Sequence, residues 1–193
     1  MPDFDGVRIG FAITGSFCTF ATAFRAAEQL RDAGAELIPI MSYNAAQLDT
    51  RFGAAADQIA RFEEICGRSV IRTIPDAEPI GPKNMTDVMV VAPCTGNTIA
   101  KLAHSITDTP VTMAVKSHLR GARPVVLAVS TNDALSGSAK NLGMLLNTRH
   151  YFAVPFRQDA PEAKPASLVA DFSRLSEAIS ASMCGIQLQP VLA

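Results

Sequence analysis

The stretch from Val88 to Ala103, VMVVAPCTGNTIAKLA, decides how the rest of the chain is interpreted. Its first part, Val88–Ala92, is apolar at every position, which predicts a strand covered on both faces, as in parallel sheets. A loop of hydroxyl, amide and glycine residues follows (Pro93–Thr98), and we expect a helix to open at Ile99. Backbone N–H groups and small polar side chains at a helix start can bind an anion. The loop is therefore a candidate for one half of a mononucleotide site.

The same unit of buried strand, polar loop and helix recurs along the chain. This alternation predicts a single α/β domain (residues 1–193) with a doubly wound parallel sheet of about six strands and helices on both faces. The strands are expected at Val7–Ile13, Glu36–Met41, Ser69–Ile74, Val88–Ala92, Pro124–Val129 and Tyr151–Pro155. The helices are expected at Phe17–Ala33, Ala45–Cys66 (interrupted near Gly53), Ile99–Ser105, Pro110–Leu119, Ser138–Asn147 and Ser167–Met183.

Prolines mark segments where we expect irregular backbone. Three prolines between Pro75 and Pro82 predict an ordered loop, because proline disfavours helix interiors and central strands. A polar loop is expected from Phe156 to Lys164, and Pro39 suggests a bulge or an irregular end in the second strand. Residues 185–193 carry no strong signal and are expected to be mobile or to pack on a partner.

The composition argues for a well-buried globular protein that binds neither nucleic acid nor a membrane. Of the 193 residues, 48% are hydrophobic and 18% are charged, and the net charge is −1 without any block of Lys or Arg. Nucleic-acid binding needs a concentrated basic face, and the longest apolar runs are too short to span a bilayer. The N-terminal MPDFDG has neither a basic nor an apolar region, so we expect no signal peptide and a cytoplasmic location.

Cysteines and histidines are scattered without the spacing of a metal site, and no metal is expected. Cys18 and Cys94 lie near predicted helix starts, where a thiolate is favoured, but free structural thiols are the preferred interpretation. The same interpretation covers Cys66 and Cys184. Packed or surface positions are preferred over a catalytic base for the three histidines, His104, His118 and His150.

Polar loops follow four of the predicted strands, at the edge where ligands bind in doubly wound sheets. Thr14-Gly15-Ser16 suits a phosphate, since Gly15 lets the backbone approach closely and Ser16 can cap the next helix. Thr95, Asn97 and Thr98 place further donors at a helix start, and the other two loops are Ser42–Asn44 and Ser130–Asp133. An ordinary helix cap without a ligand explains Thr14–Ser16, taken alone, equally well, and neither the GxGxxG nor the P-loop motif occurs.

Two charged residues near these loops have competing interpretations. Arg51, in the stretch DTRFG, could bind a substrate carboxylate through two hydrogen bonds, or it could form a surface salt bridge. Lys101 is either a surface lysine or a more distant cation that helps to bind an anion. Neither belongs to a clear acid–base pair.

The stretch APCTGNTIAKLA resembles the signature, usually a form of APxSANTxAK, of the homo-oligomeric flavin-containing cysteine decarboxylase family. Thr14–Ser16 matches the first phosphate loop of that family, and Asn132 takes the position of the asparagine in its PxMN motif. Six further stretches extend a resemblance over nearly the whole chain, to the B-subunit family of dipicolinate synthases within this superfamily. These are GFAITGSFCTF, PIMSYNA, DTRFG, EPIGP, ITDTPVTMAVKSHLR and VSTNDAL.

The resemblance implies a flavodoxin-like or Rossmann-like fold that binds FMN and forms a homo-oligomer, a trimer or larger. It implies a part in the oxidation of a dihydrodipicolinate-type intermediate to dipicolinate during sporulation, together with the A subunit of dipicolinate synthase, which carries NAD(P). Asn132 would lie near the flavin ring, and Arg51 would bind a dicarboxylic substrate. The residues implied to hold the phosphate and sugar part are Thr14, Gly15, Ser16, Ser42, Pro93, Thr95, Asn97 and Thr98.

The chain also departs from the superfamily pattern. The active-site histidine of the decarboxylases is missing, because its position falls within Glu78–Ile80, so decarboxylase or flavin prenyltransferase activity is the weakest interpretation. Gly96 stands where alanine is usual, which we expect to be harmless, and Ser130-Thr131 would give a flavin ring a more polar neighbour. The alternative to a subunit with oxidoreductase activity is a non-catalytic one that supports a nicotinamide-dependent partner.

Overall fold

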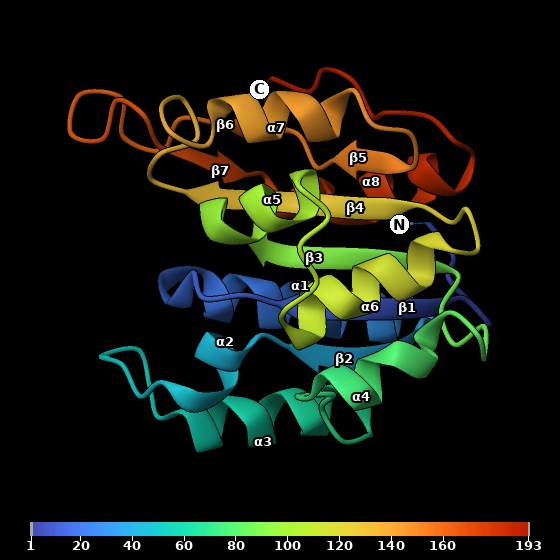
Figure 1. Cartoon of the computed structure of the whole chain (residues 1–193). Helices are drawn as coiled ribbons and strands as arrows, with labels where there is room; N and C mark the ends of the chain where they lie inside the picture. The colour runs from blue at the N-terminus through green and yellow to red at the C-terminus, as the bar shows by residue number, and fades with distance from the viewer. Residues whose placement is uncertain (1, 193) are drawn as a thin grey trace.

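Parallel strands form the centre of the sheet in a computed structural model that describes residues 2–192 (Figure 1). The order β2-β1-β3-β4 continues to β5, which pairs with the first half of β4, and all these pairs are parallel. The chain therefore reverses its direction of travel across the sheet between β2 and β3. The bounds are β1 (Arg8–Ile13), β2 (Glu36–Met41), β3 (Val88–Cys94), β4 (Val125–Thr131) and β5 (Tyr151–Ala153).

Two antiparallel strands extend the sheet where we expected a polar loop and the start of a helix. β7 (Leu168–Ala170) pairs with the end of β4, and β6 (Phe156–Arg157) pairs with β7. The final helix, α8 (Leu175–Met183), begins after a short 3-10 turn, so the prediction of a helix from Ser167 was wrong. Leu168 and Ala170 are buried while Val169 is partly exposed, and this alternation is typical of a strand.

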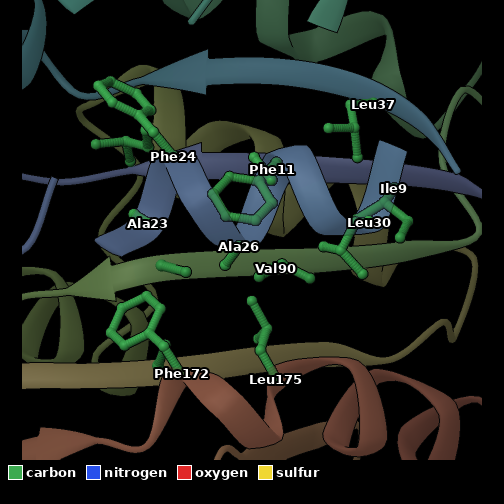
Figure 2. Close-up of a cluster of buried hydrophobic side chains, with 14 of the residues drawn as sticks. Ile9, Phe11, Ala23, Phe24, Ala26, Leu30, Leu37, Val90, Phe172 and Leu175 are labelled. Carbon is green, nitrogen blue, oxygen red and sulfur yellow. The ribbon is translucent and has the colours of Figure 1, made fainter. Parts of the chain in front are cut away.

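Helices cover both faces of the sheet, which confirms the doubly wound prediction. One face carries α1 (Phe20–Asp32), α3 (Ala55–Cys66) and α8, and the other carries α4 (Ile74–Ala77), α5 (Gly96–Ala103), α6 (Pro110–Leu119) and α7 (Ala139–Leu146) (Figure 1). The remaining helix, α2 (Tyr43–Gln47), follows β2 directly. Figure 2 shows the first face, where Phe11 of β1, Phe24 of α1 and Leu175 of α8 belong to one cluster of buried side chains.

The remaining errors in the predicted elements have local causes. Ser69–Ile74 is not a strand, because only Ile71 bridges to the sheet, at Ile40. The proline-rich segment holds α4 and a 3-10 turn (Glu78–Ile80), since each places its proline in the first turn, where no backbone N–H is needed. Pro39 causes no irregularity: its missing N–H would face the outer edge of β2, and its carbonyl accepts from the Ile71 N–H at 2.9 Å.

The ends of several segments are held by hydrogen bonds that the sequence pattern did not indicate. Helix α5 opens at Gly96 and not at Ile99, because the Thr95 hydroxyl accepts from the Thr98 N–H at 3.4 Å. The segment after α8 returns to β5, where the Gln187 amide accepts from and donates to the Ala153 backbone, both at 2.8 Å.

In residues 2–192, no helix is long and apolar enough to cross a membrane.

His118 of α6 is buried as a neutral imidazole. Its Nε2 lies 2.9 Å from the Pro124 carbonyl, which can only accept, so Nδ1 must accept from the Thr86 hydroxyl at 2.8 Å. Burial lowers the pKa of His118 to about 4. The folded chain therefore takes up this proton far less readily than the unfolded chain.

We expect acid to destabilise the protein through His118. The folded pKa is about 4 and the ordinary value is 6.5, so stability contributed by this residue is lost as the pH falls below 6.5. The loss at pH 5 is about 2 kcal/mol by proton linkage. Urea unfolding between pH 7 and pH 5 measures it, and His118→Gln should flatten the dependence. An equal slope in both proteins would contradict the assignment.

Gly96 is required by the packing of α5 against the loop between β4 and α7. A Cβ atom there would lie 2.5 Å from Ser138 Oγ, 2.7 Å from Asp133 Oδ1 and 2.8 Å from Thr131 Oγ1. Real Cβ atoms essentially never come within such distances of another heavy atom, so these three side chains, which are hydrogen-bonded to one another through Asp133, would have to shift. Glycine therefore fits at this position of the chain, and the alanine that is usual in the superfamily would not fit without a shift of its neighbours.

Gly96→Ala should destabilise the protein by roughly 1–3 kcal/mol through overpacking, although alanine favours a helix by about 1 kcal/mol. Gly143→Ala on α7 is the matched control, because a Cβ atom there meets no other atom within 4 Å. It should stabilise the protein by up to about 1 kcal/mol. Urea unfolding compares the two, and a gain from both substitutions would refute the packing argument.

Candidate mononucleotide site

Two adjoining cavities open at the carboxyl ends of β1, β3 and β4. We call them the β1–β3 cavity, of about 360 Å³, and the β4 cavity, of about 270 Å³. Gly15 and Thr95 line both cavities and so form the boundary between them. The cavities lie where the strand order reverses, which is the place where open α/β sheets bind ligands.

The β1–β3 cavity contains most of the residues that were expected to bind a cofactor. They come from three loops, after β1, β2 and β3, and they are Thr14, Gly15, Ser42, Thr95, Asn97 and Thr98. Ser42 caps α2, where it accepts from the Ala45 N–H at 3.3 Å. Asn97 is exposed in the first turn of α5. The cavity therefore combines neutral donors with a helix N-terminus, an arrangement that favours an anion.

Thr14 and Pro93 connect the loops after β1 and β3. The Thr14 hydroxyl donates to the Pro93 carbonyl at 2.7 Å and accepts from the Thr95 N–H at 3.1 Å. The Thr14 N–H also donates to the Pro93 carbonyl, at 3.3 Å. Pro93 itself is buried and lines neither cavity, so its part in the site is to hold the two loops together.

The β4 cavity is built around three hydroxyl groups that bond to one another. Ser16 Oγ lies 2.9 Å from Ser130 Oγ and 3.0 Å from Thr19 Oγ1, and the third side of this triangle is 3.0 Å. Asn132 lies exposed at this cavity, on the loop that follows β4. Asp133 steadies this loop by accepting from the Thr131 hydroxyl at 2.6 Å and from Ser138 at 2.9 Å.

Each cavity is bordered by one lysine that is paired with one aspartate. In the β1–β3 cavity Lys101 Nζ lies 2.8 and 2.9 Å from the two carboxylate oxygens of Asp108. In the β4 cavity Lys164 Nζ lies 3.0 Å from Asp159 Oδ2. Hydrogen bonding from Lys101 lowers the pKa of Asp108, and hydrogen bonding from Ser167 and then from Lys164 lowers the pKa of Asp159.

Several candidate residues lie outside the two cavities. Arg51 is exposed between α2 and α3, with its guanidinium carbon 4.9 Å from the centre of the Phe52 ring, and it lines neither cavity. Cys94 is buried, and burial raises the pKa of its thiol, so the expected preference for a thiolate does not apply to it. Within residues 2–192, no histidine lines either cavity.

Sequence reasoning missed one wall of the β4 cavity. It consists of residues from the hairpin formed by β6 and β7, among them Asp159, Lys164 and Ser167. The segment was interpreted as a loop and a helix, which placed no side chain near Ser130. The alternating burial of Leu168, Val169 and Ala170 was the available signal, but three residues are too few to identify a strand by period.

Comparison with known proteins shows the family to which this chain belongs. The family model described as Flavoprotein matches residues 3–158. The B subunit of dipicolinate synthase from Bacillus subtilis (strain 168) is 45% identical over 192 residues, which cover 100% of this chain and 96% of that protein.

Solved structures agree with this match. The crystal structure of the dipicolinate synthase B subunit from Bacillus halodurans C has a TM-score of 0.91 and 40% identity, covering 100% of this chain and 98% of that one. The FMN-dependent cysteine decarboxylase SpaF has a TM-score of 0.72 at 22% identity, covering 93% and 98%, a likeness of fold alone. The chain therefore belongs to the Flavoprotein family, and it is similar over its whole length to dipicolinate synthase B subunits.

Proposed function

We propose that this chain is the FMN-binding B subunit of a dipicolinate synthase and takes part in the oxidation of a dihydrodipicolinate-type intermediate to dipicolinate. The observation that carries the proposal is the meeting of the loops after β1, β2 and β3 around one cavity that continues into a second. The 45% identity to a dipicolinate synthase B subunit over the full chain supports the reaction.

The residues present suit the chemistry of FMN. In the β1–β3 cavity, hydroxyl groups, the start of α5 and the ammonium group of Lys101 are partners for a phosphate and for sugar hydroxyls. The β4 cavity offers Asn132 and the side chains of Leu168 and Val169, a polar and an apolar wall that suit a flavin ring. Thr14, Gly15, Ser42, Thr95, Asn97 and Thr98, which line the β1–β3 cavity, would then hold the phosphate and sugar part, while Ser16 lines the β4 cavity.

The reaction removes two electrons and two protons from a six-membered nitrogen ring. FMN, when bound, would supply an acceptor for the electrons, while this chain supplies binding and orientation. NAD(P) would be held by the A subunit, the expected partner. The protein would act in the cytoplasm during sporulation, as a homo-oligomer of three or more copies. Because Arg51 lies outside both cavities, its predicted part in binding the substrate would need a movement of its loop or a neighbouring copy.

Purified protein should take up FMN and turn yellow, and Asn97→Asp should weaken this binding at least about tenfold, or ~1.4 kcal/mol, by repelling the phosphate. The same substitution places a negative charge in the first turn of α5, which stabilises the helix by about 0.3–1 kcal/mol. We therefore expect the affinity for FMN, measured by absorption titration, to fall while the stability, measured by thermal unfolding, rises.

Gln29→Glu on α1, outside both cavities, is the control with the same change of charge. It should leave the affinity for FMN unchanged. A wild-type chain that takes up no FMN would remove the flavin from the proposal.

The alternative of a non-catalytic supporting role has one observation in its favour, since no histidine within residues 2–192 lines either cavity. Activity of the A subunit should therefore be measured in isolation, with the FMN-loaded chain and with the FMN-free chain. We expect dipicolinate formation to rise only with the loaded chain. An equal rise with the FMN-free chain would favour the supporting role.

A further inference from the structure

We propose that Lys164 binds a carboxylate of the dicarboxylic substrate and that Asp159 competes with the substrate for this lysine. The inference rests on the proposed function, because it concerns the substrate of the same site. The proposal assigns carboxylate binding to Lys164, which lines the β4 cavity, because Arg51 lies outside that cavity. Three observations carry it: the placement of the β6–β7 segment, the charges that line the cavity, and the exposure of the ion pair.

The segment between β6 and β7 holds the backbone of Lys164 at the edge of the β4 cavity. β7 pairs with Ser130 and Thr131 at the end of β4, so the segment projects past the carboxyl edge of the sheet (Figure 1). Backbone bonds fix it internally, from the Lys164 N–H to the Ala160 carbonyl at 2.7 Å. The Leu135 N–H, which donates to the Ala166 carbonyl at 2.9 Å, ties it to the loop after β4.

Lys164 and Asp159 are the only charged side chains among the described residues that line the β4 cavity. The hydroxyl groups of Ser16, Thr19 and Ser130 are already bonded to one another. A ligand with negatively charged carboxylates therefore has one cation to bind in this cavity, and that cation is Lys164.

The ion pair between Lys164 and Asp159 is of a kind that can exchange partners. The two side chains are 51% and 33% exposed, and only one oxygen of Asp159 lies within bonding distance of the lysine. Water screens such a pair, so it contributes little to stability and costs little to open. Lys101 differs, because its side chain is 21% exposed and it contacts both oxygens of Asp108.

Exchange of partners predicts effects of opposite sign for the two residues. Lys164→Gln removes the cation that the substrate needs, so binding should weaken. Asp159→Asn removes the competing carboxylate and leaves the cation, so binding should strengthen. An ion pair with a purely structural role predicts that both substitutions act in the same direction or that neither has an effect.

The test is a calorimetric titration of the full-length, FMN-loaded chain with dipicolinate at pH 7. We expect Lys164→Gln to raise the dissociation constant about tenfold, the usual size for loss of a charge-assisted bond. Asp159→Asn should lower the constant about two- to fivefold, a smaller change because the competing pair is exposed. Lys83→Gln, which changes the same charge outside both cavities, should leave it unchanged.

Each other result overturns the inference in a way that can be recognised. An unchanged dissociation constant in Lys164→Gln overturns it and leaves the proposed function intact. Weaker binding in both variants assigns the pair a structural role. If Lys164→Gln weakens the binding of FMN and leaves the binding of dipicolinate unchanged, the lysine belongs to the cofactor site. A wild-type chain that binds FMN but no dipicolinate overturns the inference together with the proposed substrate.

Discussion

The parallel pairing of β1 with β3 is the constraint on which the candidate site depends. Ala12 lies opposite Val91, so both strands end at the same edge of the sheet and their loops must meet there. The hydroxyl group of Thr14 then joins the two loops through Pro93 and Thr95. Since α1 leaves β1 toward one face and α5 leaves β3 toward the other, a space opens between the helices, and this space is the site.

In both cavities the groups between the loops are neutral, and the charged side chains lie at the borders. Between the loops the groups are neutral and are bonded to one another, as in the triangle of Ser16, Thr19 and Ser130. Such satisfied networks make a site rigid at little cost of desolvation. The charges stand at the borders, where each lysine already has an aspartate. The site therefore has a fixed shape, and its charges are balanced until a ligand replaces one partner.

Sequence reasoning was right where an element is long and its pattern repeats. The strand Glu36–Met41 and the helix Pro110–Leu119 have the predicted bounds, and β3 contains the predicted strand Val88–Ala92 and continues to Cys94. It was wrong where a few residues adopt a structure that only a distant partner stabilises. The β7 strand forms because β4 offers free backbone groups near Ser130, and no local pattern reveals that.

By itself, the sequence determined the fold class and the loops that carry the site, because burial periodicity and capping are local properties of the chain. It also identified the loop residues that the structure places in two adjoining cavities. Only the tertiary structure decided that Gly96 has no room for a side chain, that Arg51 lies outside the cavities and that Lys164 borders one. These three facts depend on which distant segments touch, and that is set by strand pairing and packing across the whole domain.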